Sequence, residues 1–148
     1  MSSISTFLLL LGLVVVVYGS RAHNNFFETL TEEQKEAVSK ILHGGLTKSE
    51  IKEQLHQWVS SQSKEVQEAF QKAEEALEAR KARVRSRHMK LLSSASDEAK
   101  KLDARIRKIY EDQSLTKQQT CLKVQGLIRS ASEKARKELK LKVKECDH

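Results

Sequence analysis

Residues 31–60 read TEEQKEAVSKILHGGLTKSEIKEQLHQWVS, and the signals in this segment indicate a helical fold. It contains two capping-box patterns, TEEQ from Thr31 and TKSE from Thr47, in which a threonine and a Glu or Gln three residues later close a helix N-terminus reciprocally. Gly44-Gly45 stands between them, and glycine commonly follows the last turn of a helix. Apolar residues recur at helical spacing after each threonine. The stretch predicts two helices joined by a short turn.

The same signals continue to the C-terminus. The chain has no proline, and it is dominated by residues with high helix propensity. Four further helices are expected: one long helix over about 64–92, then helices capped by Ser96, Thr116 and Ser132, the last ending near Cys146. Gly126, inside the helix that Thr116 begins, suggests that a neighbouring helix approaches closely there. We predict an all-α, single-domain bundle of about six helices over residues 23–148.

The N-terminus carries an apolar run, FLLLLGLVVVV at residues 7–17, that is too short to span a bilayer. Its length fits the apolar region of a secretory signal peptide, and small residues at Gly19 and Ala22 offer cleavage sites. The alternative is an uncleaved anchor. We predict a signal peptide at residues 1–22 and a secreted, extracellular mature chain that has no transmembrane segment.

Cys121 and Cys146 are the only cysteines. An even pair in an exported chain suggests a disulfide. Two free thiols or one intermolecular link are the alternatives. We predict the intramolecular bond.

Neither the histidines nor any glycine-rich motif forms a recognisable catalytic pattern, so the sequence favours a protein that is not an enzyme. Residues 79–90, ARKARVRSRHMK, are basic and contain no acidic side chain. They predict either an anionic-surface binding site or a solvated helix face; a nucleic-acid partner is disfavoured because no aromatic residues interleave the cations. The candidate residues are Arg80, Lys81, Arg83, Arg85, Arg87 and Lys90.

The turn EDQSLT, residues 111–116, is the candidate cation site. Oxygen-bearing side chains alternate at Asp112, Ser114 and Thr116, with Glu111 beside them, and such a partial ligand set suits Mg²⁺ better than Ca²⁺. The alternative is a helix end followed by an N-cap, which explains the serine and the threonine equally well. A helical carrier of a small apolar ligand such as a lipid is a further alternative, because amphipathic helices can also enclose a cavity.

IKEQLHQWV (51–59), SDEAKKLDARIRKIYEDQSLT (96–116) and KVQGLIRS (123–130) resemble the nematode SXP/RAL family of secreted antigens, whose shared domain is the Anisakis-allergen-like cation-binding domain. The resemblance is strongest over residues 51–139. It implies calmodulin-like helix pairs, Mg²⁺ rather than Ca²⁺ as the cation, and a non-enzymatic antigen or effector at the parasite–host boundary. Its partner would be an unidentified protein or small ligand. Asp112 and Ser114 match the family's turn, whereas Gln113, Thr116 and Lys117 depart from it.

Overall fold

The computed structural model describes residues 26–146, and the regular structure in this range is helical. A helical turn at residues 26–28 precedes the helices α2 (Glu32–His43), α3 (Lys48–Ser60), α4 (Lys64–Ser93), α5 (Asp97–Glu111), α6 (Lys117–Ser130) and α7 (Glu133–Glu138). The predicted all-α fold is confirmed. The predicted signal peptide, residues 1–22, lies outside the described residues. Among the described helices, none combines the length and the apolar character needed to cross a membrane.

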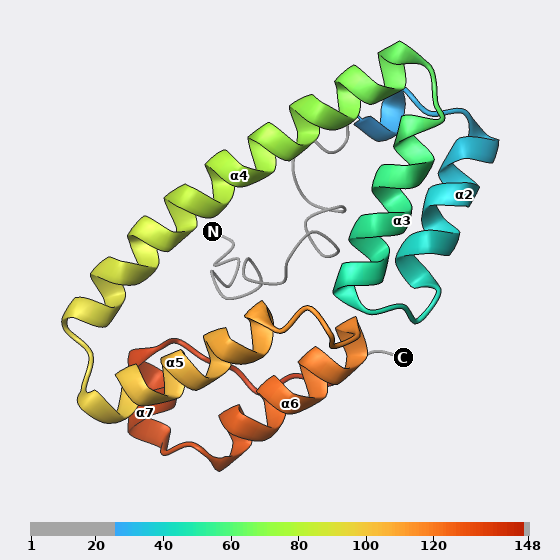
Figure 1. Cartoon of the computed structure of the whole chain (residues 1–148). Coiled ribbons are helices and arrows are strands. Elements are labelled where there is room, and N and C mark those ends of the chain that lie inside the picture. Colours follow the sequence, from blue (N-terminus) through green and yellow to red (C-terminus); the bar gives the residue numbers. More distant parts are fainter. Residues whose placement is uncertain (1–25, 147–148) are drawn as a thin grey trace.

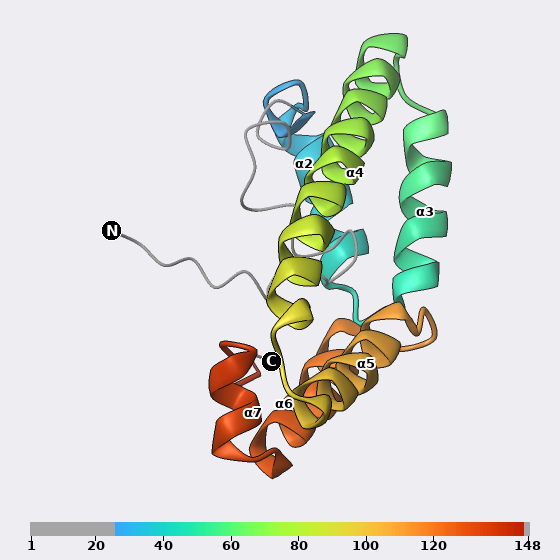
Figure 2. The same ribbon diagram turned by 90° about the vertical axis from the view of Figure 1, so that its left-hand side faces the viewer.

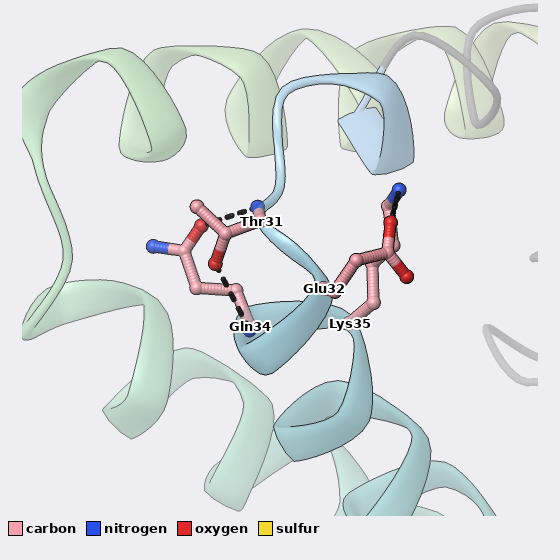
Figure 3. Close-up of polar contacts among 4 residues, drawn as sticks. All are labelled: Thr31, Glu32, Gln34 and Lys35. Carbon is pink, nitrogen blue, oxygen red and sulfur yellow. Dashed lines mark hydrogen bonds and ion pairs between the residues drawn. The ribbon is translucent and has the colours of Figure 1, made fainter.

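The helices begin where the capping patterns predict. The Thr31 hydroxyl accepts a hydrogen bond from the Gln34 N–H at 3.2 Å, and the Gln34 side chain accepts one from the Thr31 N–H at 2.9 Å (Figure 3). Thr47 and Thr116 form the same capping box at α3 and α6. Each box satisfies backbone donors that the first turn of a helix leaves free. Gly45, just beyond the end of α2, has a φ of 70°, which explains why glycine is needed there.

The buried apolar side chains form two clusters, one at each end of the long helix α4 (Figures 1 and 2). The N-terminal cluster joins the segment before α2 to α2, α3 and the start of α4 through Phe26, Leu30, Val38, Leu42, Ile51, Leu55, Val59, Val66 and Phe70. The C-terminal cluster joins the end of α4 to α5, α6, α7 and the chain after it through Leu92, Ala95, Ala99, Leu102, Ile106, Val124, Ile128, Ala135, Leu139 and Leu141. We call these two parts the N-terminal lobe and the C-terminal lobe.

The turn between α2 and α3 pairs with the turn between α5 and α6. Thr47 and Thr116 form an antiparallel bridge, and the Lys48 N–H donates to the Leu115 carbonyl at 3.2 Å. The Ser49 N–H donates to the Gln113 carbonyl at 3.1 Å. Both turns end in Leu-Thr-Lys, at residues 46–48 and 115–117. The pairs α2–α3 and α5–α6 are therefore joined turn to turn.

The last helix is much shorter than expected. It ends at Glu138, where the Lys140 N–H donates to the Lys137 carbonyl and the Leu141 N–H donates to the Arg136 carbonyl. These two bonds form a Schellman motif, with Lys140 taking the left-handed conformation at a φ of 54°. The prediction of a helix to Cys146 was wrong because Leu141 is drawn into the C-terminal core, which a continuing helix would prevent.

Residues 141–146 instead return without regular structure to α6, and we call them the C-terminal strap. A disulfide joins Cys146 to Cys121 on α6, with the two Cα atoms 5.9 Å apart, which is the intramolecular pairing predicted above. The Lys144 N–H donates to the side chain of the buried Gln125 at 2.8 Å, so a second contact attaches the strap to α6.

Candidate functional site

The predicted cation turn follows α5 directly. Asp112 is the C-cap of α5, and its Oδ1 accepts hydrogen bonds from the Ser114 N–H at 3.0 Å and from the Ser114 hydroxyl at 2.6 Å. These bonds hold the pKa of the Asp112 carboxyl below its ordinary value. The Thr116 hydroxyl accepts from the Gln119 N–H at 3.1 Å. The turn therefore uses one carboxylate oxygen and both hydroxyl groups in its own hydrogen bonds.

A lysine from the other helix pair reaches the same place. Lys48, the first residue of α3, is only 6% exposed, and its ammonium donates to the Tyr110 carbonyl at 2.7 Å and approaches the Ile109 carbonyl at 3.4 Å. These carbonyls belong to the last turn of α5, where the helix dipole is negative. Burial lowers the pKa of Lys48, and the charge of Asp112 opposes that shift. Lys48 shares one face of α3 with Ile51 and Leu55, the signal that could have identified it in the sequence.

The residues at this turn do not fit a resident divalent cation. Mg²⁺ and Ca²⁺ need about six or more oxygen ligands, with carboxylates among them. Asp112 and the exposed Glu111 are the acidic side chains of the turn, and no group of three His, Cys, Asp or Glu side chains in residues 26–146 is arranged to hold a metal ion. Lys48 and Lys123 act electrostatically on Asp112, so an incoming ion would also meet positive charge.

A second polar cluster is buried where α4 meets α5. The Asp103 side chain is fully buried; its Oδ1 lies 2.6 Å from Nε2 of His88, and its Oδ2 accepts from Nε of Arg107 at 2.9 Å. Sequence reasoning missed this cluster. The available signal was an aspartate between Leu102 and Ile106 on the buried face of α5. The cluster joins the end of α4 to the C-terminal lobe.

The predicted anionic-surface residues lie on the second half of α4. Arg83, Arg85, Arg87 and Lys90 are exposed, and no ion pair is formed by them within the described residues. Arg80 and Lys81 are half-buried, and Lys81 pairs with Glu78 at 2.6 Å. The exposed cations are thus available to an external anion, whereas Lys81 already has an acidic partner.

Charge is separated along the whole described chain. Residues 26–78 contain 6 Lys or Arg against 11 Asp or Glu, a net charge of −5. Residues 79–146 contain 20 Lys or Arg against 8 Asp or Glu, a net charge of +12. Because the two lobes lie at opposite ends of α4, this separation in sequence is also a separation in space (Figure 1).

One groove of about 420 Å³ lies beside α3 and the turn after α5. It is lined by polar and charged residues, although most of the surface that they expose there is apolar, and it is open to solvent. A pocket normally encloses most of an apolar ligand, and this groove is open, so it does not support a lipid carrier. The lining residues are Ser49, Lys52, Glu53, His56 and Gln113.

Comparison with known proteins connects the sequence of this chain to a family. A family model described as "SXP/RAL-2 family protein Ani s 5-like, metal-binding domain" matches residues 1–142, nearly the whole chain. The chain belongs to the SXP/RAL-2 family. The SXP/RAL-2 family protein Ani s 5 of Anisakis simplex is 27% identical over 114 residues, which cover 77% of this chain and 68% of the relative. No solved structure matches the chain. The description of the family model includes the term "metal-binding domain". In this SXP/RAL-2 member, the ammonium of Lys48 lies at the turn where the resemblance predicts a bound cation.

Proposed function

We propose that this SXP/RAL-2 family chain is exported, acts outside the cell at the boundary between nematode and host, and binds an anionic surface through its basic half without catalysing a reaction. The separation of charge carries the proposal: residues 79–146 carry a net charge of +12, residues 26–78 carry a net charge of −5, and the two lobes lie at opposite ends of α4. Such a distribution orients a molecule on an anionic surface with its C-terminal lobe inward.

The exposed cations of α4 supply the first contact. Arg83, Arg87 and Lys90 follow one another at the spacing of one helix face, so a flat anionic surface can meet all three together. Their charges are screened beyond about 8–10 Å at physiological salt, so binding depends on close approach and weakens as salt is added.

Retention on heparin and on vesicles containing phosphatidylserine tests the contact. The triple variant Arg83→Gln, Arg87→Gln, Lys90→Gln is expected to elute at clearly lower salt than the unmodified protein. A control with the same loss of net charge replaces three lysines of the acidic half, and it should retain most of the binding. The control substitutions are Lys40→Gln, Lys64→Gln and Lys72→Gln. Equal loss in both variants would show that only net charge matters, and retention insensitive to salt would remove the proposal.

Export rests on separate support. The apolar run at residues 7–17 has signal-peptide length, and the bond between Cys121 and Cys146 is of the kind that persists in oxidising compartments. Expression of the full chain in secretory cells, followed by mass spectrometry of the medium, should give a protein that begins at Ser20 or His23. Intact chain retained inside the cells would reject export while leaving the charge argument to be judged by its own experiment.

A further inference from the structure

Lys48 is the residue whose placement the charge proposal leaves unexplained. A lysine at the first position of a helix is normally solvated, yet Lys48 is 6% exposed and extends from α3 to the C-terminal end of α5. Burying an ammonium is costly unless it is well paired. Its partners are the carbonyls of Ile109 and Tyr110. These carbonyls lie in the last turn of α5, where the helix has no further N–H group to donate a hydrogen bond to them.

The surroundings of this ammonium are those that attract a cation. Two backbone carbonyls point at it, the negative end of the α5 dipole lies beneath it, and the Asp112 carboxylate acts on it electrostatically. The backbone bonds from Lys48 to Leu115 and from Ser49 to Gln113 fix the segment that presents it. The ammonium therefore neutralises the end of α5 and joins the two turns at once.

We propose that the Lys48 ammonium is the resident cation of the turn after α5, so that this chain joins its two helix pairs without a divalent ion and excludes one from that turn. The exclusion follows from Coulomb repulsion. A divalent ion roughly 6 Å from an ammonium in water loses about tenfold in affinity. Exclusion of a divalent ion from this turn is independent of anionic-surface binding by α4.

Substitutions at Lys48 in the mature chain with its disulfide intact test the proposal. Lys48→Met removes the charge and keeps most of the apolar stem, whereas Lys48→Arg keeps a cation. Lys52→Met is the matched control, because Lys52 is an exposed lysine one turn later on α3. The amide NMR shifts of residues 111–116 are followed as MgCl₂ is added at constant ionic strength.

The unmodified protein, Lys48→Arg and Lys52→Met are expected to show no saturable shift at millimolar Mg²⁺. Lys48→Met should show a saturable shift at these amides in the millimolar range, because removing the ammonium removes a repulsion that lowers affinity about tenfold. A saturable millimolar response in the unmodified protein would overturn the proposal, and that measurement stands even where Lys48→Met fails to fold. A folded Lys48→Met that gains no Mg²⁺ response would overturn it as well.

Discussion

The buried Asp103 carboxylate gives the sharpest test of how the C-terminal lobe is held to α4. Asp103→Asn keeps the side-chain volume but removes the charge and places an amide donor against Arg107 or His88. Each hydrogen bond to a charged group contributes about 1.5–3 kcal/mol, and a buried donor left without an acceptor costs about 1–3 kcal/mol. Because the Arg107 side chain is 42% exposed and can turn to water, we discount its share. The expected loss in the free energy of unfolding is about 3 kcal/mol.

Urea unfolding followed by circular dichroism measures this loss. With a denaturant slope of about 1.5 kcal/mol per molar, the midpoint should fall by about 2 M. Arg107→Gln should cost less than about 1 kcal/mol, since its partner keeps His88 and Arg107 itself is partly solvated. Asp97→Asn, an exposed aspartate in the first turn of the same helix, should also cost less than about 1 kcal/mol. An Asp103→Asn protein within about 0.5 kcal/mol of the unmodified one, or an equal cost for Arg107→Gln, would refute the reasoning.

Four further tests follow from the local geometry. Gly126 is helical and exposed, and no described atom lies within 4 Å of an added Cβ, so Gly126→Ala should raise the free energy of unfolding by about 1 kcal/mol. Gly45 has a φ of 70°, so Gly45→Ala should lower the free energy of unfolding by about 1–2 kcal/mol. Thermal denaturation of the two variants distinguishes the two signs. Replacing Cys121 and Cys146 with serine opens a loop of 25 residues, which should cost about 3 kcal/mol and remove hydrogen-exchange protection from the strap but not from α2. Hydrogen bonds from Ser96, at the N-terminus of α5, lower the pKa of the Glu138 carboxyl from its ordinary 4.5. The stability that this carboxylate contributes is therefore complete above pH 4.5 and is lost as the pH falls through the lower folded pKa. Unfolding midpoints measured across pH should show a smaller acid-side loss of stability in Glu138→Gln, and an unchanged pH dependence would contradict this prediction.

The expectation that a neighbouring helix packs closely against Gly126 was wrong. A glycine inside a helix lowers stability wherever it lies, so its presence suggests a steric need. Among the described residues, no atom lies within 4 Å of the position that a Cβ would take there. Helix propensity shows how much stability a glycine inside a helix costs. Only the packing of neighbouring helices shows whether closer contacts compensate for that loss.

The starts of the helices could be predicted from the sequence because they depend on local chemistry. Thr31, Thr47 and Thr116 each cap a helix together with a side chain three residues away. The sequence also identified the cysteine pair and the basic half of α4, which are properties of residue type and order. Tertiary structure alone decided that α7 stops at Glu138 and that Lys48 and Asp103 are buried with partners from other segments. Those outcomes depend on side chains far apart in the chain meeting in a low-dielectric interior, where the energy of a charge is set by its neighbours in space.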